Sequence, residues 1–431
     1  DAQRDRLLAG FRWILVDEYQ DIGPGQYALI SALAGRKRTD EDGKLNLFAV
    51  GDDDQNIYAF AGASVEFIRR FEADYQAQTR FLVENYRSTA NIIDIANALI
   101  EPASERMKRE HPIRIDNARA RSPAGGEWQS GDRVALGRVQ ILPAGRNAEQ
   151  QAMAVLTELR RLQSFGLELS RTAVIARQWK FLDPFRAACE HLGLPVSMAD
   201  EDAPPLWRLR ETQALLSFAE GRGPLVKVGT LQTWLTERND GEWADCLRYA
   251  IAAFAEETQD AEVSLPWFRD WLTEWGRASR QRQTGVLLLT AHRAKGLEFD
   301  HVFVLDGEWT GQKGEDADAA RRLYYVAMTR ARQTLTLARL DIGNPLVDRL
   351  SDSPALLRRP ASEWLPEPPG LDRRYVIPSL RETDLGFAGR KKPGERIHAR
   401  IAALKVGDVL LLSTDQRGYA LLTPDGIAIG H

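Results

Sequence analysis

A short apolar run, Trp13 to Val16, ends in two adjacent carboxylates, Asp17 and Glu18. A continuous apolar run is typical of a parallel strand that is buried on both faces. Charge then appears at the carboxyl end of the strand, where ligands bind in open α/β sheets. An Asp there can hold Mg²⁺, and a Glu beside it can orient or deprotonate a water molecule. Taken alone, the pair is better explained as a solvated acidic turn.

Strand-like and helix-like segments alternate along much of the chain. Strands are expected at residues 13–16, 45–50, 80–83, 139–142, 172–176, 286–289, 301–305 and 334–338. Helices are expected between them, for example from Thr89 to Ile100 and from Glu149 to Phe165. This alternation predicts an α/β fold with parallel sheets. Residues 101–138 are polar and rich in Arg, Gly and Pro, which predicts a long loop.

Two segments depart from the alternation. Residues 205–280 predict a helical, Trp-rich insertion, in which Trp267, Trp271 and Trp275 share one helical face. Packing against the motor core explains these tryptophans best, and a surface that contacts duplex DNA is the alternative. From Pro360 onwards a proline-rich linker is followed by short strand-like runs, which predict a small β module at the carboxyl end.

Composition sets broad limits on function. The 431 residues carry a formal net charge of −4, so the chain lacks the global basic excess of an architectural DNA-binding protein, although a local basic groove remains compatible. Cys189 and Cys246 form no metal or redox spacing, which favours a reducing cytoplasm. No apolar run reaches the length of a membrane helix, and we expect no membrane partner.

A second apolar run leads into an acidic loop with a glutamine and two aromatic residues. The loop reads Gly51-Asp52-Asp53-Asp54-Gln55-Asn56-Ile57-Tyr58-Ala59-Phe60. A glutamine at a strand end can sense a γ-phosphate or position water. Exposed aromatic residues two positions apart can stack on unpaired bases. An acidic turn followed by two core aromatic residues explains the same pattern equally well.

Three further segments carry groups that can hold a nucleotide or a phosphate. They are Glu84-Asn85-Tyr86-Arg87-Ser88-Thr89, Thr290-Ala291-His292-Arg293-Ala294-Lys295-Gly296-Leu297-Glu298-Phe299, and the basic helix from Arg321 to Arg332. Their arginines, lysine, hydroxyl and imidazole are all phosphate ligands, and Glu298 could bind a ribose hydroxyl. Singly, each segment has a structural explanation: a salt bridge, a hydrogen-bonded histidine or a solvated helix face.

The order and spacing of these segments are more specific than any one of them. In series, they resemble motifs II, III, IV, V and VI of superfamily 1 DNA helicases of the UvrD/Rep/PcrA type, from about Phe11 to Leu340. The resemblance implies an α/β fold with two RecA-like P-loop NTPase motor domains, the first incomplete. It also implies ATP and Mg²⁺ as cofactors and single-stranded DNA and DNA junctions as partners.

The resemblance implies roles for individual residues. The catalytic set is Asp17, which also holds the metal, Glu18 as catalytic base, Gln55 at the γ-phosphate, and Arg87 and Arg330 as arginine fingers. Tyr86 would stack on the adenine and Glu298 would bind the ribose. The DNA-binding residues would be Tyr58 and Phe60, as a base-stacking platform, and Thr290 and His292, at the backbone.

The chain also departs from the family pattern. The Walker A loop, motif I, is absent, and Gly43-Lys44 is no substitute because no glycine loop precedes it. We expect motif I in a preceding segment, and we expect this fragment alone to be inactive. Phe60 stands where the family usually has Trp, Ala61 where it has Arg, and Arg293 where it has Ser.

These observations lead to one expected organisation. The expected segments are 1–80 (remainder of the first motor domain), 81–204 and 281–345 (the two parts of the second), 205–280 (a reduced helical accessory domain) and 346–431 (a linker and the β module, which could bind a protein partner). The expected function is a 3′–5′ ATP-dependent DNA helicase in repair or recombination. A translocase that does not unwind and a non-hydrolysing DNA-binding scaffold are the alternatives.

Overall fold

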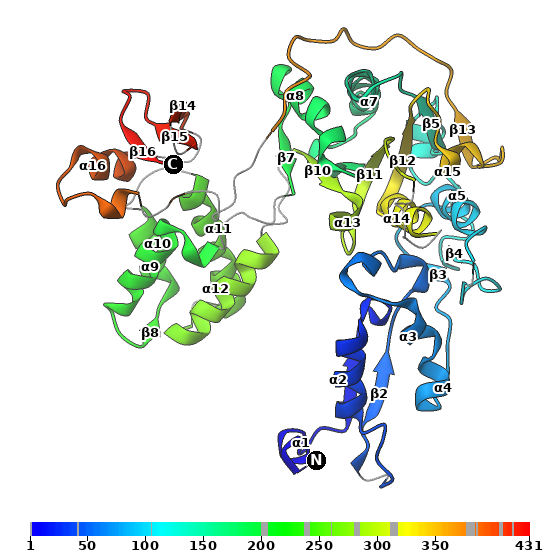
Figure 1. Ribbon diagram of the computed structural model, residues 1–431, viewed down its shortest axis with the longest axis horizontal. Coiled ribbons are helices and arrows are strands. Elements are labelled where there is room, and N and C mark those ends of the chain that lie inside the picture. The colour runs from blue at the N-terminus through cyan, green and yellow to red at the C-terminus, as the bar shows by residue number, and fades with distance from the viewer. Residues whose placement is uncertain are drawn as a thin grey trace. The chain divides into compact units, whose positions relative to one another are not determined.

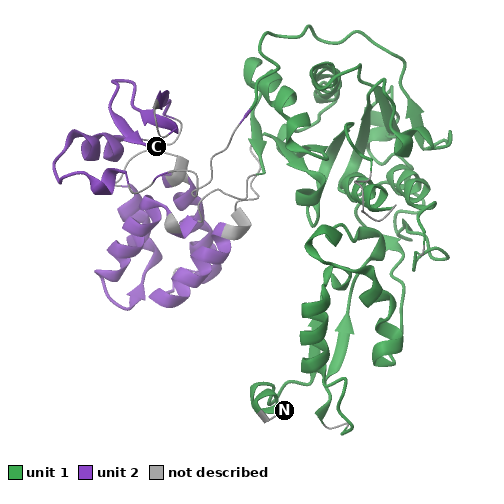
Figure 2. Cartoon of the chain, in the orientation of Figure 1, with its two compact units in different colours: residues 1–199, 283–374 green, residues 200–282, 375–431 purple. Residues whose placement is uncertain are grey.

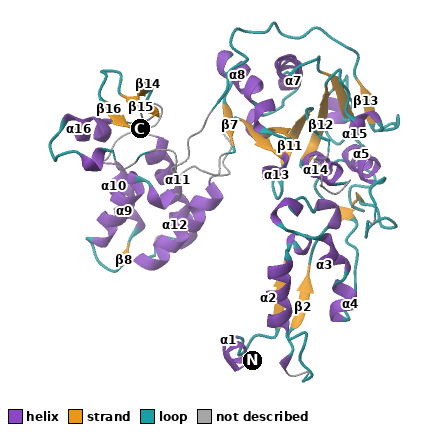
Figure 3. Ribbon diagram, viewed as in Figure 1, coloured by secondary structure: helices purple, strands orange, loops and turns teal. Residues whose placement is uncertain are grey.

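In the computed structural model, the described residues are 2–40, 43–104, 106–199, 206–236, 242–259, 261–279, 285–310, 318–375, 384, 387–404, 408–415 and 418–431. The chain forms two compact units, residues 1–199 with 283–374 and residues 200–282 with 375–431 (Figure 2). Each unit is assembled from two separate stretches of chain. The first unit mixes strands and helices, whereas helices dominate the 200–282 stretch of the second (Figure 3).

The amino-terminal part of the first unit is built on a two-stranded parallel sheet. Strand β1 (Trp13–Val16) pairs in register with β2 (Asn46–Ala49), so that Val16 lies beside Ala49. The flanking helices are α1 (Ala2–Leu7), α2 (Pro24–Ala34), α3 (Val65–Arg69) and α4 (Phe71–Tyr75) (Figure 1). Val16 and Ala49 pack against a small core of Tyr19, Ile22 and Phe67.

The expectation that β1 is buried on both faces is wrong for the described chain. Trp13 is 61% exposed and Leu15 is 74% exposed, whereas Ile14 and Val16 are partly buried. A parallel strand is buried on both faces only when neighbouring strands and helices cover it on both sides. Among the described residues β1 pairs with β2 alone, and the face that carries Trp13 and Leu15 is open.

A seven-stranded parallel sheet forms the main body of the first unit, which confirms the α/β prediction with a parallel sheet. Its strands, in spatial order, are β13 (Leu356–Arg358), β5 (Val139–Pro143), β12 (Ala331–Arg339), β11 (Phe299–Leu305), β6 (Thr172–Ala176), β10 (Val286–Thr290) and β7 (Val196–Met198). The edge strands β7 and β13 have three residues each, and the sequence did not predict them. β13 lies in a segment that was expected to be a linker.

Helices cover both faces of this sheet, as Figure 1 shows. One face carries α7 (Ala148–Gln163) and α8 (Asp183–His191), and the other carries α5 (Ala90–Ile100), α13 (Ala291–Ala294) and α14 (Ala319–Met328). In α5, Ile92, Ile95 and Leu99 recur at helical spacing and are almost fully buried. The short helix α15 (Pro345–Asp348) follows β12.

The segment between the two sheets differs from its prediction. Residues 80–83 are not a strand. They have no pairing partner, Leu82 is exposed, and the strand β3 is only Glu84–Asn85. It pairs with β4 (Arg114–Ile115), and this strand and α6 (Trp128–Gly131) interrupt the predicted long loop. An apolar run forms a strand only where a neighbouring strand accepts its backbone hydrogen bonds.

A buried charge network stabilises α7. Arg161 donates to both carboxylate oxygens of Asp132 at 2.8 Å and to Glu158 at 2.6 Å, and Asp132 and Glu158 are buried. Removing one partner of such a pair leaves buried charge uncompensated. We therefore expect Arg161→Met to lower the free energy of unfolding by about 3 kcal/mol, measured by urea denaturation. The neighbouring Arg160 is exposed, so Arg160→Met is the control and should change stability little.

The second unit joins a helical region to a small antiparallel sheet. Its elements are α9 (Arg210–Glu220), β8 (Leu225–Val226), α10 (Val228–Thr236), α11 (Glu242–Thr258), β9 (Val263–Ser264), α12 (Leu265–Ser279), α16 (Arg396–Ala403), β14 (Leu411–Asp415), β15 (Gly418–Leu422) and β16 (Ala428–Gly430). Trp271 and Trp275 stack on each other at 6.2 Å and pack against the helical core. Trp271 and Trp275 therefore have a packing role, but the core that they contact is that of the helical region itself and not the motor core that the sequence predicted.

None of the helices in the described part of the chain has both the length and the apolar character that crossing a membrane requires.

Candidate active site

Asp17 and Glu18 lie at the end of β1, where the chain turns into a 3₁₀ helix, Tyr19–Asp21. Both carboxylates are exposed. Glu18 adopts a left-handed conformation, with φ 51° and ψ 42°, which is uncommon for a residue other than glycine. Asp17 Oδ1 accepts a hydrogen bond from the Glu18 backbone N–H at 2.8 Å, and Glu18 Oε2 accepts one from Gln20 Nε2 at 2.5 Å. The strained turn is thus held by side chains on both sides of it.

Asp17 suits the metal role expected of it. Its carboxylate is exposed, and Oδ1 accepts the hydrogen bond from the Glu18 backbone N–H. Mg²⁺ prefers oxygen ligands, keeps several of its waters and needs only one or two protein carboxylates. When bound, it would neutralise charge on phosphate oxygens, and Asp17 would fix its position beside Glu18.

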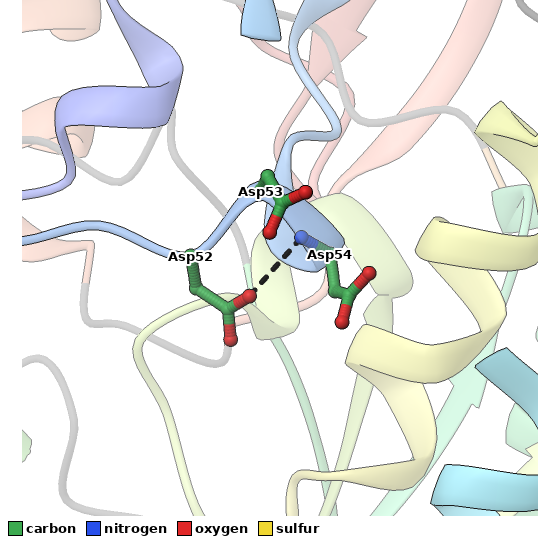
Figure 4. Close-up of side chains that lie close together, drawn as sticks. All are labelled: Asp52, Asp53 and Asp54. Carbon is green, nitrogen blue, oxygen red and sulfur yellow. Dashed lines mark hydrogen bonds between the residues drawn. The ribbon is translucent and has the colours of Figure 1, made fainter. Parts of the chain in front are cut away.

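A second acidic group follows β2. The carboxylates of Asp52, Asp53 and Asp54 lie within 4.8 Å of one another, and the Asp54 backbone N–H donates to Asp52 (Figure 4). Their oxygens are nevertheless occupied by protein donors. Arg106 binds Asp54 through two nitrogens, Lys108 binds Asp52, and the Met107 backbone N–H binds Asp53. The turn is therefore held in place by an arginine, a lysine and a backbone N–H, and its geometry does not support a metal site.

Gln55 and Arg330 meet beside this turn, although 275 residues separate them in the sequence. Gln55 Nε2 donates to Asp52 Oδ2 at 2.8 Å, and Gln55 Oε1 accepts from Arg330 Nη2 at 3.4 Å. Arg330 is only 3% exposed and also donates to the carbonyl oxygens of Val326 and Leu297. Burial, and then repulsion from Arg87, lower the pKa of Arg330 to about 10, so it stays charged at neutral pH.

A cavity of about 100 Å³ opens at this point. Its lining includes Asp52, Gln55, Asn85, Arg87, Tyr325 and Arg330. Arg87 Nε donates to Glu298 Oε2 at 2.6 Å, and Glu298 also accepts from Arg332 at 3.2 Å. Arg87, which was expected at the γ-phosphate, and Glu298, which was expected at the ribose, therefore form an ion pair with each other. Tyr86 is exposed beside them, and its hydroxyl donates to Glu84 at 2.9 Å.

The four residues expected at DNA occupy one neighbourhood around α13. The Tyr58 hydroxyl donates to the His292 backbone carbonyl at 3.2 Å, and the Phe60 ring meets the His292 ring edge to face at 5.3 Å. Phe60 is 72% exposed, whereas Thr290 is buried at the end of β10. Tyr58, Phe60 and His292 therefore form a continuous aromatic group, and Thr290 contributes little accessible surface to it.

Three cations play a larger part in the site than the sequence indicated. Lys295, recognised only as a general phosphate ligand, is buried and contacts Asp21, Glu18 at 3.4 Å and the Gln55 carbonyl at 3.1 Å. Its Nζ also lies 5.3 Å from the centre of the Tyr58 ring. Arg106 and Lys108 fell within a predicted loop. In the sequence, these two residues stand out only as members of a cluster of basic residues. Their acidic partners cannot be recognised there, because they are more than 50 residues away.

Comparison with known proteins identifies two matching domains in the chain. Residues 2–76 match the UvrD/REP helicase N-terminal domain, and residues 285–338 match the UvrD-like helicase C-terminal domain. DNA helicase II of Escherichia coli is 30% identical over 412 residues, covering 76% of this chain and 55% of that protein. The ATP-dependent DNA helicase UvrD2 of Mycobacterium tuberculosis is 29% identical over 359 residues, covering 76% of this chain and 47% of that protein.

A third relative extends over more of the chain. The ATP-dependent DNA helicase PcrA of Staphylococcus epidermidis is 25% identical over 504 residues, covering 93% of this chain and 65% of that protein. The chain thus spans roughly half to two thirds of the length of these curated relatives. Both domain matches include segments of the site, the first the two acidic strand ends and the second the Lys295 and Arg330 regions. The chain belongs to the UvrD/REP family of superfamily 1 helicases.

Proposed function

We propose that this chain is part of an ATP-dependent DNA helicase that moves 3′ to 5′ along single-stranded DNA. One observation carries the proposal. Two buried cations from the 285–338 region, Lys295 and Arg330, reach the loops that follow β1 and β2. Lys295 contacts Glu18, and Arg330 contacts Gln55. A nucleotide at this junction would be sensed by groups from both parts of the chain.

The proposed organisation follows the two sheets. Residues 1–80 would be the remainder of a first RecA-like motor domain, and residues 81–204 and 281–345 would form a second. Residues 205–280 would be a reduced accessory domain. The second motor domain would extend past residue 345 to its edge strand β13 (Leu356–Arg358), and a linker and a β module would follow that strand. The Walker A lysine and its backbone cradle do not occur in this chain, so another segment has to supply them.

In this proposal, ATP would bind at the cavity between the two sheets. Glu18 would activate water, Asp17 would hold Mg²⁺, and Gln55 would contact the γ-phosphate. Arg87 and Arg330 would stabilise the charge that develops on the transferred phosphoryl group. The Arg87–Glu298 ion pair would then have to open, because its two members turn to the phosphate and the ribose. Tyr86, exposed beside them, would stack on the adenine.

The DNA contact would lie on the aromatic group of Tyr58, Phe60 and His292. Lys295 connects this group to the catalytic carboxylates, because it contacts Glu18 on one side and the Tyr58 ring on the other. A shift of the bases on Tyr58 would therefore move Lys295 and change its contact with Glu18. This connection offers a physical route from ATP hydrolysis to movement along the strand.

Base stacking by Phe60 gives a separate prediction. Stacking on an aromatic side chain contributes about 1–3 kcal/mol per base. We therefore expect Phe60→Ala to weaken single-stranded DNA binding by about 10-fold, and Phe60→Trp to keep or strengthen it. Fluorescence anisotropy with a labelled oligonucleotide measures both. Phe81 stacks on His111 away from this group, so Phe81→Ala is the control.

Unwinding tests the proposed function as a whole. The full-length protein should separate a duplex that carries a 3′ single-stranded tail in the presence of ATP and Mg²⁺, and should fail on a matched duplex with a 5′ tail. ATP hydrolysis without strand separation would instead support a translocase. DNA binding without any hydrolysis would contradict the proposal and leave a scaffold with a helicase-like fold.

A further inference from the structure

The acidic turn after β2 is clamped by a loop from a distant part of the sequence. Arg106 Nε lies 2.9 Å from Asp54 Oδ1, and Arg106 Nη2 lies 2.7 Å from Asp54 Oδ2. The two side chains are 7% and 2% exposed. The Met107 backbone N–H donates to Asp53 at 2.8 Å. A bidentate pair of this kind fixes geometry strongly, so the turn and the loop behave as one rigid piece.

Lys108, next in the same loop, makes a different contact. Its Nζ lies 2.6 Å from Asp52 Oδ2 and 3.6 Å from Asp54 Oδ2. The same Asp52 oxygen accepts the hydrogen bond from Gln55 Nε2 at 2.8 Å. Burial alone would lower the pKa of Lys108, but the charges of Asp52, Tyr325 and Asp54 and the hydrogen bond to Asp52 together outweigh burial and raise the pKa. Lys108 therefore stays charged beside the oxygen that holds Gln55.

The contacts form a chain from Lys108 to Asp52, from Asp52 to Gln55, and from Gln55 to Arg330. We infer that Lys108 is a positioning residue, and this inference rests on the proposed function. The charge of Lys108 holds Asp52 in place, and Asp52 in turn orients the Gln55 amide towards the γ-phosphate site. Arg106 clamps the turn through Asp54, and none of its hydrogen bonds reaches Asp52 or Gln55. Lys108 and Arg106 thus have separate tasks.

Two neighbouring carboxylates, those of Asp52 and Asp54, face Lys108. Asp52 and Asp54 both form ion pairs with Lys108, and without that cation the two carboxylates repel each other across a short distance. Asp52 is the more exposed of the two, so it is the one free to rotate towards water. Gln55 would then lose the acceptor that orients its amide. Small misplacements of a positioned group reduce rates by up to about 100-fold, and we expect about 10-fold here.

The test is a double-mutant cycle on the full-length protein. Lys108→Met should lower kcat for ATP hydrolysis stimulated by single-stranded DNA by about 10-fold. In a Gln55→Ala background the same substitution should cost less than about 2-fold, because Gln55 is already lost. Lys108→Arg should recover most of the rate. Arg109 is exposed in the same loop and donates only to the Ala103 carbonyl, so Arg109→Met is the matched control and should match wild type.

The outcomes separate this inference from the proposed function. An equal loss in both backgrounds, or no loss on Lys108→Met, would overturn the positioning role while leaving the helicase proposal intact. A wild-type protein that hydrolyses no ATP would overturn both. If thermal unfolding shows that Lys108→Met does not fold, Asp52→Ala takes its place in the cycle. It should show the same loss and the same dependence on Gln55.

Discussion

Replacing Glu18 with Gln is expected to lower kcat for ATP hydrolysis by roughly 10²- to 10⁴-fold, the range over which a positioned general base acts. Gln keeps the size of the side chain and its hydrogen-bonding capacity, but it cannot accept a proton from water. The left-handed turn that presents residue 18 is held by backbone and side-chain bonds, so the site should keep its shape. Binding of single-stranded DNA should be unchanged, because Tyr58 and Phe60 are untouched.

Steady-state hydrolysis and DNA anisotropy on the same preparations check this result. Glu66→Gln is the matched control. It is an exposed carboxylate that pairs with Arg70 on the solvent side of α3, and its removal should leave hydrolysis at the wild-type rate. Hydrolysis by Glu18→Gln within a few-fold of wild type would assign the catalytic base to another residue.

Substituting Arg330 is expected to have a comparably large effect. Arginine fingers contribute about 10³-fold or more to phosphoryl transfer, and we expect a loss of this order in kcat for Arg330→Ala. The side chain is almost fully buried, and its bonds to Val326 and Leu297 already fix the guanidinium before any nucleotide is present. Preorganised charge of this kind stabilises a transition state without reorganisation.

Burial also makes Arg330 a structural residue, so two further variants separate the effects. Arg330→Lys keeps the charge but loses the planar fork, and it should fold and remain at least about 10-fold slower than wild type. Arg339→Ala removes an arginine from β12 that pairs with Asp348, and it should hydrolyse ATP normally. A well-folded Arg330→Lys protein with the wild-type rate would show that the fork is not needed.

The features that could be predicted from the sequence are local ones. Apolar runs such as Val139 to Leu142 and Thr172 to Ala176 identify buried strands within a few residues, because their burial depends on their own composition. The helix after Thr89 was found for the same reason, since its apolar spacing and its cap lie within one short segment. The candidate site residues could be proposed from the sequence because their motifs are contiguous and occur in series.

The features that were missed depend on distant parts of the chain. The exposure of Trp13 and Leu15 follows from what pairs with and covers β1, which the run itself does not reveal. The same holds for residues 80–83, which lack a pairing partner. Contacts such as Lys295 with Asp21 and Arg106 with Asp54 join segments far apart in the sequence. Charge alone does not identify which carboxylate a lysine or an arginine will meet.

The central claim is that groups from both sheets act together on ATP and that DNA on the aromatic group controls them. The most direct test is the rate of ATP hydrolysis by the full-length protein, measured with and without single-stranded DNA at saturating ATP and Mg²⁺. We expect slow hydrolysis without DNA and a rate at least about 10-fold higher with DNA, within the range that coupling between two sites usually reaches. A rate that is zero, or that DNA leaves unchanged while it binds, would contradict the account.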